Sequence, residues 1–226
     1  MPEKKILVIA AHPDDETIGC GGSLCRHASE NDEIAVITLT NGVGSRNESN
    51  ESDLSSREIS AKKAIDILGA HWIAKGDFPD NAMDSAPLLE IVKFIEATKE
   101  KFDPDIIYSH SPSDLNVDHK VSTAATLTAF RPQPGEKNSE IRLFEIPSAT
   151  DYTIEELDGS FNPNLFINIE EFWNSKLDAL KCYESEMREY PHSRSYKKIR
   201  SLAEHRGSQS GLKLAEAFML VRKIHR

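Results

Sequence analysis

The sequence has few cysteines, no long apolar run and no excess of basic residues. Its three cysteines include no C-x-x-C pair, so we expect reduced thiols and a cytoplasmic protein rather than a disulfide framework. No run approaches the roughly 18 apolar residues of a membrane-spanning helix, and we find no signal-peptide cleavage site near the first residue. The formal net charge of −10 argues against a nucleic-acid partner, because binding to the phosphate backbone requires a basic patch.

Two common catalytic signatures are also missing. No G-x-S-x-G nucleophile elbow occurs, which argues against a serine hydrolase of that type. The glycines of residues 19–22 read G-x-G-G and follow the first apolar run at a distance, unlike the G-x-G-x-x-G turn of dinucleotide sites. The second apolar run ends in Thr40 and Asn41, without the acid that binds a ribose hydroxyl in nicotinamide enzymes.

Short apolar runs alternate with amphipathic segments along the 226 residues. This alternation predicts an α/β fold, a Rossmann-like, mostly parallel twisted sheet with helices on both faces. We expect a single domain over residues 1–226, because no linker or internal repeat divides the chain. The expected strands cover residues 6–11, 34–39, 71–74, 105–109, 142–146 and 164–168. The expected helices cover residues 16–29, 56–69, 86–101, 119–130, 170–188 and 211–223.

The first expected strand ends in an unusually polar turn, which contains His12, Pro13, Asp14, Asp15 and Glu16. Open α/β sheets bind ligands at the carboxyl ends of their strands. The H-x-x-D spacing of His12 and Asp15 can bring an imidazole nitrogen and a carboxylate oxygen to one zinc ion. The acids alone could instead cap a helix and complement its dipole, but that leaves His12 unexplained. We therefore expect a metal site for Zn²⁺, or for another divalent ion such as Fe²⁺.

A catalytic zinc needs a third protein ligand and an open position for water. His119 is the best candidate, because it follows another expected strand whose carboxyl end lies on the same edge. Asp114 or Asp118 could orient its ring as a hydrogen-bond acceptor. Asp14 then serves as the general base that takes a proton from the attacking water.

Further candidates lie at the same edge or in polar segments. His110 ends the expected strand 105–109, so it could contact the site. His192 and Arg206 lie in polar loops, as either loop anchors or substrate contacts. Residues 43–54 are polar and lack any periodicity, which is typical of a surface loop or a lid.

Together these motifs resemble one family, the PIG-L/LmbE-like deacetylases, which are zinc-dependent enzymes that remove acetyl groups from N-acetyl amino sugars and related conjugates. Ala11–Glu16, with the sequence AHPDDE, resembles the hallmark of this family. Further blocks similar to those of the family follow in order at residues 40–42, 57–58, 68–69, 78–81, 118–119, 191–195, 206–209 and 216–218.

The resemblance implies specific roles for residues of this chain. Asp14 would be the general base, while Arg57 and Asp80 match positions where family members hold sugar hydroxyls. The implied fold is a single Rossmann-like domain. The implied zinc ligands are His12, Asp15 and His119.

The sequence departs from the family at Asn116. Better-known members have a histidine three residues before the third ligand, which is thought to stabilise the transition state or to relay protons. Asparagine can donate a hydrogen bond to an oxyanion but cannot act as an acid. Protonation of the leaving amine would then fall to Asp14, His110 or His192, and the substrate of the relatives cannot simply be transferred.

The sequence therefore predicts a zinc-dependent hydrolase that removes the acetyl group from an N-acetylated amino sugar or glycoconjugate. One alternative is a zinc amidohydrolase with a non-sugar N-acyl substrate. Another is a non-catalytic metal-binding or sugar-binding module. The sequence does not specify the sugar, the metal or the oligomeric state. It is compatible with a homo-oligomer.

Overall fold

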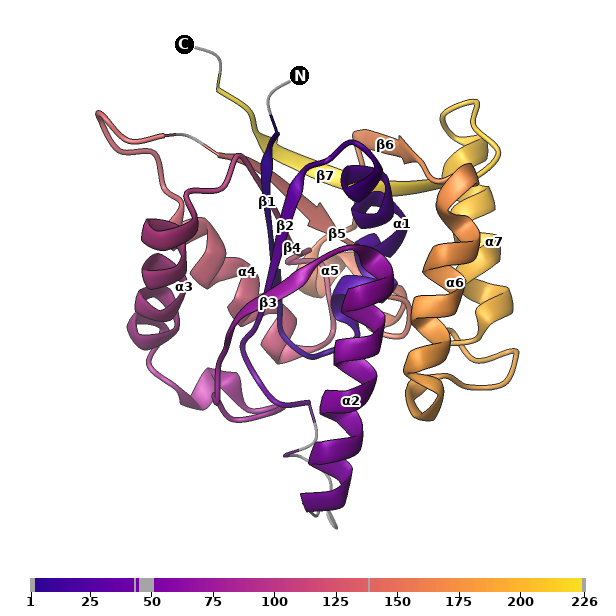
Figure 1. Cartoon of the computed structure of the whole chain (residues 1–226), viewed down its shortest axis with the longest axis horizontal. Coiled ribbons are helices and arrows are strands. Elements are labelled where there is room, and N and C mark those ends of the chain that lie inside the picture. Colours follow the sequence, from indigo (N-terminus) through magenta and orange to yellow (C-terminus); the bar gives the residue numbers. More distant parts are fainter. Residues whose placement is uncertain (1–2, 43, 45–50, 138, 225–226) are drawn as a thin grey trace.

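A central sheet with helices on both faces organises the computed structural model (Figure 1), which describes residues 3–42, 44, 51–137 and 139–224. Within these residues seven strands form one sheet in the order β3-β2-β1-β4-β5-β7-β6. The strands are β1 (Lys5–Ala10), β2 (Glu33–Thr38), β3 (His71–Lys75), β4 (Ile106–His110), β5 (Glu140–Phe144), β6 (Leu165–Asn168) and β7 (Ala215–Arg222).

The strands β3, β2, β1, β4 and β5 run parallel, whereas β7 pairs antiparallel with both β5 and β6. The predicted mostly parallel sheet is therefore confirmed. Residues 6–11 are completely buried, as expected for an apolar strand that is covered on both faces. Because β1 and β4 are parallel neighbours, the turns that follow Ala10 and His110 leave the same edge of the sheet.

Helices form the two outer layers (Figure 1). One core lies between the sheet and α1, α2, α6 and α7, and the other lies between the sheet and α3 and α4. The helices are α1 (Asp15–Ser29), α2 (Glu51–Leu68), α3 (Leu88–Phe102), α4 (Val117–Ala129), α5 (Glu155–Asp158), α6 (Trp173–Cys182) and α7 (Tyr196–Ser208). Short 3₁₀ turns are η1 (Met83–Ser85), η2 (Thr150–Tyr152), η3 (Glu170–Phe172) and η4 (Glu184–Glu186).

Two glycines let α1 pack closely on its neighbours. A Cβ atom at Gly19 would overlap the ring of Phe144 on β5, and one at Gly22 would lie 2.9 Å from the Cβ of Ile169. Such distances are too short for real side chains. The glycine-rich stretch therefore serves helix packing at these two positions.

The expected helix 211–223 is wrong, because this segment contains the strand β7. Its alanine, glutamate, methionine and leucine residues favour a helix locally. The pairing of β7 with β5 and β6 outweighs that preference. The chain instead forms a helix earlier, at α7, where the side chain of Ser195 accepts a hydrogen bond from the backbone of Lys198 and caps the first turn.

Two other helix predictions need correction. The expected helix 170–188 is shorter, because only residues 173–182 are α-helical and 3₁₀ turns flank them. The helix expected at 56–69 begins earlier, at Glu51. The proposed lid 43–54 therefore overlaps α2, and residues 43 and 45–50 lie outside the described residues.

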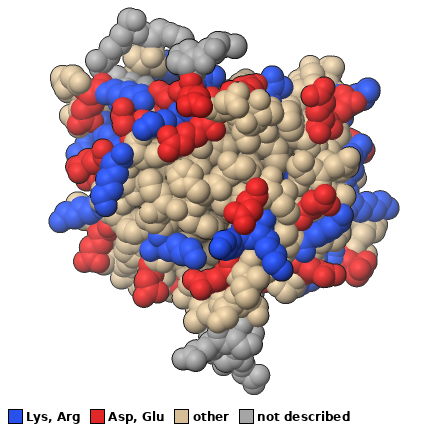
Figure 2. Space-filling view, in the orientation of Figure 1, with Lys and Arg blue, Asp and Glu red and all other residues tan. Residues whose placement is uncertain are grey.

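The surface carries mixed charges. Lys and Arg are intermixed with Asp and Glu on the face shown in Figure 2. Among the described residues, no helix combines the length and apolar character that crossing a bilayer requires.

Candidate metal centre

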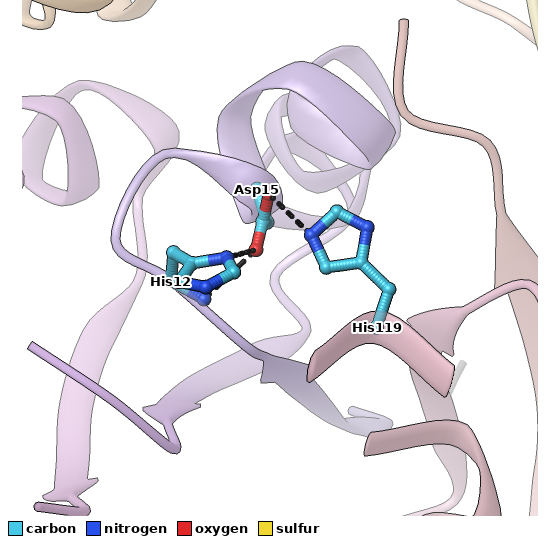
Figure 3. A group of neighbouring side chains, drawn as sticks. All are labelled: His12, Asp15 and His119. Atoms are coloured by element: carbon cyan, nitrogen blue, oxygen red, sulfur yellow. Dashed lines mark hydrogen bonds and ion pairs between the residues drawn. The ribbon is translucent and has the colours of Figure 1, made fainter. Parts of the chain in front are cut away.

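His12, Asp15 and His119 converge at the carboxyl edge of the sheet (Figure 3). His12 lies in the turn after β1, Asp15 begins α1, and His119 lies in the first turn of α4. The Nδ1 atom of His12 lies 3.2 Å from Oδ2 of Asp15, and Nε2 of His119 lies 3.6 Å from Oδ1 of Asp15. All three side chains are buried, and one ligand atom from each lies within 4.8 Å of the others.

The acids Asp14 and Asp15 of this turn do not act as simple caps of α1. Asp14 has a φ of 131°, a strained value for a residue with a side chain. Its backbone N–H donates to the carboxylate of Glu16, and its side chain makes no capping hydrogen bond to α1. The carboxylate of Asp15 accepts the backbone N–H of His12. Helix capping therefore does not account for Asp14 and Asp15.

Two buried atoms of this group lack a hydrogen-bond partner among the described residues, Oδ1 of Asp15 and Nε2 of His119. Buried polar atoms without a partner are rare in folded proteins. A cation between the two atoms would satisfy both of them. The donor set of two imidazoles and one carboxylate suits zinc and also other divalent ions such as Fe²⁺. The residues therefore fit a divalent metal ion.

Each histidine has a carboxylate against its other ring nitrogen. Nδ1 of His119 lies 3.0 Å from Oδ2 of Asp114, and Nε2 of His12 lies 3.0 Å from Oδ2 of Asp118. Such pairs fix the orientation of a ligating imidazole and increase its basicity. Of the two acids proposed to orient His119, Asp114 contacts it, whereas Asp118 contacts His12.

Two residues of this group have strongly shifted pKa values. Burial would lower the pKa of His12, but its hydrogen bonds with Asp118 and Asp15 outweigh burial and raise the pKa to about 10. Burial would likewise raise the pKa of Asp15, yet the nearby His119 and His110 hold it well below its usual range. The buried acids thus strongly favour a positive charge at this position, which is what a bound cation supplies.

Asp80 belongs to a second group of possible metal ligands, together with His12 and Asp118. Its Oδ1 atom lies 3.4 Å from Nε2 of His12 and accepts a hydrogen bond from Thr40. The carboxylate of Asp118 already accepts the backbone N–H groups of residues 81 and 83. The first group is the better metal site, because two of its facing atoms, Oδ1 of Asp15 and Nε2 of His119, lack a hydrogen-bond partner in the described chain.

Two arginines contact Asp14. Nη2 of Arg57 lies 3.1 Å from its Oδ2 atom, and Nη1 of Arg194 lies 3.2 Å from the same oxygen. Arg57 also pairs with Glu186 at 2.8 Å. The sequence predicts a sugar contact for Arg57 and assigns no role to Arg194. The position of Arg194 in the block 191–195, which is similar to a block of the family, was the signal in the sequence that could have pointed to this residue.

His110 is completely buried beside the candidate metal ligands. Its ring stacks on that of His119 at a centroid distance of 4.0 Å, and its Nε2 atom accepts the backbone N–H of Ala11. Burial and the neighbouring His119 lower its pKa to about 4. His110 is therefore neutral at pH 7, and its ring packs against that of His119.

The other candidates form hydrogen bonds with the backbone or with another side chain. Asn116 caps α4, where its side chain accepts the N–H of Asp118. His192 is exposed, and its Nδ1 atom accepts the backbone N–H of Arg194. Arg206 is in α7 rather than a loop, and it forms two hydrogen bonds of 2.7 Å with Glu145.

Known proteins share both the sequence pattern and the fold. A family model described as "PIG-L: GlcNAc-PI de-N-acetylase" matches residues 7–130. The "Uncharacterized deacetylase YaiS" of Escherichia coli (strain K12) is 30% identical over 188 residues, which cover 80% of this chain and 91% of that protein. The "4-oxalmesaconate hydratase" of Pseudomonas putida is 26% identical over 196 residues, which cover 80% of this chain and 73% of that protein.

A solved structure extends the similarity in fold to nearly the whole chain. The N,N'-diacetylchitobiose deacetylase from Pyrococcus horikoshii superposes with a TM-score of 0.78 and 22% identity, over 96% of this chain and 84% of that one. At this identity the superposition supports the fold alone. The family match covers more than half of the chain and contains the whole group His12, Asp15 and His119. The chain therefore belongs to the PIG-L family, whose members are mostly deacetylases and include hydratases.

Proposed function

We propose that this protein is a zinc-dependent N-deacetylase that releases acetate from an N-acetylated amino sugar or glycoconjugate. The observation that carries the proposal is the pairing of a buried set of metal ligands with an adjacent acid, Asp14, whose Oδ1 atom has no hydrogen-bond partner in the described chain. That atom can accept a proton. The deacetylases among the relatives support the reaction, and the family description, GlcNAc-PI de-N-acetylase, supports an N-acetyl amino sugar as the substrate class.

In this proposal His12, Asp15 and His119 hold the ion. A bound Zn²⁺ would supply Lewis-acid polarisation of the acetamide carbonyl and would acidify a water molecule. Oδ1 of Asp14 takes the proton from the water that attacks the carbonyl carbon. The C–N bond then breaks, and acetate and a free amine leave.

The same acid also delivers the proton to the leaving amine. Asn116 cannot be an acid, and its side-chain oxygen caps α4. His110 is buried and neutral at pH 7. His192 is exposed, and its Nδ1 atom accepts the backbone N–H of Arg194. We therefore assign both proton transfers to Asp14. His192 and Asp80 remain proposed substrate contacts, the latter beside His12 with a side chain that is only 2% exposed.

The test combines elemental analysis with acetate release from N-acetylglucosamine, N,N'-diacetylchitobiose and UDP-N-acetylglucosamine. Asp14→Asn should lose at least about 10²-fold in turnover, as expected for removal of a general base, and should keep its metal. Asp84→Asn, at an exposed acid outside the site, is the matched control. Equal loss of zinc and turnover in Asp14→Asn would make Asp14 a ligand and contradict the assignment.

A second candidate is water addition to a carbon–carbon double bond, because one relative is a 4-oxalmesaconate hydratase. A metal-held water and a carboxylate base serve that reaction too. Zinc-loaded protein that releases no acetate but hydrates 4-oxalmesaconate would favour the hydratase. Zinc binding with neither activity would favour a non-sugar N-acyl substrate or a binding module.

A further inference from the structure

The two oxygens of the Asp14 carboxylate have different surroundings. Oδ2 lies within 3.2 Å of two guanidinium groups, one from Arg57 and one from Arg194. Oδ1 is buried and has no hydrogen-bond partner among the described residues. A carboxylate can normally exchange its oxygens by rotating about χ2, because that torsion is broad and two-fold. The two arginines make one orientation of Asp14 preferred.

Arg194 is itself held in place from the opposite side. Its Nε atom donates to the hydroxyl of Ser148 at 2.9 Å, and its carbonyl accepts the backbone N–H of Arg188 at 3.2 Å. Ser148 has a φ of 75°, an uncommon value for a serine. The guanidinium of Arg194 therefore bridges this turn and Asp14, which lies 180 residues away in the sequence.

Arg57 and Arg194 contact Asp14 from different parts of the chain. Arg57 reaches Asp14 from α2 and is also paired with Glu186. Arg194 approaches from the segment before α7, outside residues 7–130 that the family model matches. The family match therefore gives Arg194 no role.

We propose that Arg194 is a positioning residue, which together with Arg57 fixes Oδ2 of Asp14 and leaves Oδ1 as the proton-accepting atom. This inference rests on the proposed function, in which Asp14 is the general base. It predicts an effect on the chemical step rather than on substrate binding, because a misplaced base slows proton transfer. A displacement of about 1 Å at a reacting group can cost roughly 10²-fold in rate.

The first test measures acetate release by Arg194→Ala and Arg194→Lys. We expect the alanine variant to lose about 10²-fold in kcat with KM within about two-fold of wild type, and to keep its zinc content. The lysine variant should have an intermediate kcat, because lysine supplies a charge without the planar fork. Arg200→Ala, at an arginine of α7 that pairs with Glu204, is the control and should keep wild-type kinetics. An increase in KM at unchanged kcat would overturn the proposal and make Arg194 a substrate contact.

Chemical rescue separates positioning from a general structural defect. The side chain of Arg194 is 22% exposed, so a small cation can enter the space that the alanine variant leaves. Guanidinium chloride at a concentration well below denaturation should raise the kcat of Arg194→Ala several-fold and should leave Arg200→Ala unchanged. In an Asp14→Asn background, Arg194→Ala should lower turnover no further, because both changes remove the same step. Equal rescue of both arginine variants, or fully additive losses, would contradict the proposal.

A crystal structure of Arg194→Ala gives a readout that does not depend on activity. Asp14 should rotate or occupy two orientations there, whereas the wild-type orientation retained in full would overturn the inference. If wild-type protein releases no acetate from any substrate, the proposed function fails, and the crystal structure still decides whether Arg194 positions Asp14. If wild-type protein is active and Arg194→Ala has normal kcat, only the inference fails.

Discussion

Asp114 links His119, a proposed metal ligand, to the surrounding loop. Its Oδ2 atom lies 3.0 Å from Nδ1 of His119, and its Oδ1 atom accepts the backbone N–H of Asn116. Asp114→Asn replaces the carboxylate with a neutral amide, which orients the ring less well. We expect metal affinity to fall about 10- to 100-fold, measured by competition with a chromogenic chelator. Asp84→Asn should bind metal as the wild type does, and an unchanged affinity for Asp114→Asn would contradict this role.

His27 makes the stability of the fold depend on pH. Burial lowers its pKa below the ordinary value and outweighs its hydrogen bond with Asp32, while the positive charge of Arg142 acts in the same direction as burial. Its other ring nitrogen contacts Tyr108. Below about pH 6.5 the unfolded chain binds a proton at His27 that the folded chain does not bind. This contribution to the free energy of unfolding is therefore present above that pH and is lost as the pH falls.

The corresponding measurement is urea unfolding between about pH 7.5 and 5.5, a range that spans the ordinary histidine pKa. The wild type should lose more stability over this range than His27→Gln, which does not titrate. Comparing how the free energy of unfolding changes with pH in the two proteins cancels the contributions of the titrating groups that both proteins share. Parallel slopes would show that His27 is protonated equally in both states.

Single residues differ in how far the sequence predicts them. His12 and Asp15 lie in one turn, so their proposed joint role as metal ligands follows from spacing and ligand chemistry. His119 requires the further step that two parallel strands end at one edge of the sheet. The contact between Arg194 and Asp14 was not predictable, because it depends on the path of the chain after β5 and because arginines are common in any sequence.

At the scale of secondary structure, the packing of α1 is more sensitive to a substitution at Gly19 than to one at Gly21. Gly19→Ala would force its new methyl group into the ring of Phe144, whereas a Cβ at Gly21 would lie no closer than 3.4 Å to its neighbours. We expect Gly19→Ala to lower the free energy of unfolding by roughly 1 to 3 kcal/mol, which is typical of overpacking. Gly21→Ala on the same helix should cause no such loss. Urea denaturation measures both, and equal effects would contradict the packing argument.

The prediction of a helix at 211–223 failed because local propensity and tertiary pairing disagree there. The apolar runs of β1, β2 and β4 are short and rich in β-branched residues, so propensity and burial agree and the prediction succeeds. In β7, Ala215 and Ala217 carry no preference for a strand. Pairing with β5 and β6 decides the structure of this segment.

β7 is also tied to the helices by a buried ion pair. The carboxylate of Glu216 accepts backbone N–H groups of Gly22 and Ser23 on α1 and lies 2.6 Å from Nζ of Lys176 on α6. Lys176→Met should cost about 3 kcal/mol in unfolding free energy, because Glu216 stays buried without its cation. Lys213→Met removes an exposed pair with Glu170 and should leave stability unchanged within error. Similar losses in both variants would contradict this view.

At the scale of the whole molecule, the two halves of the chain build one structure. The family model matches residues 7–130, yet the later residues add β7 beside β5, Glu216 against α1, and Arg194 against Asp14. The first half alone would leave an edge of the sheet and one face of α1 exposed. We therefore propose that residues 1–226 fold as a single cooperative domain.

The two tryptophans make this proposal measurable, because Trp72 lies on β3 and Trp173 begins α6. Trp72→Phe leaves Trp173, which reports on the second half of the chain. Trp173→Phe leaves Trp72, which reports on the first half. In each variant, urea unfolding followed by fluorescence should coincide with unfolding followed by far-UV circular dichroism, as two-state behaviour requires. A midpoint for either indole that differs from the midpoint of the backbone signal in the same variant would show two units. Coincidence is expected because α6 packs on α1 and α2 in the same core as the strands β1 and β2, so neither half can lose its structure without exposing the apolar surface of the other.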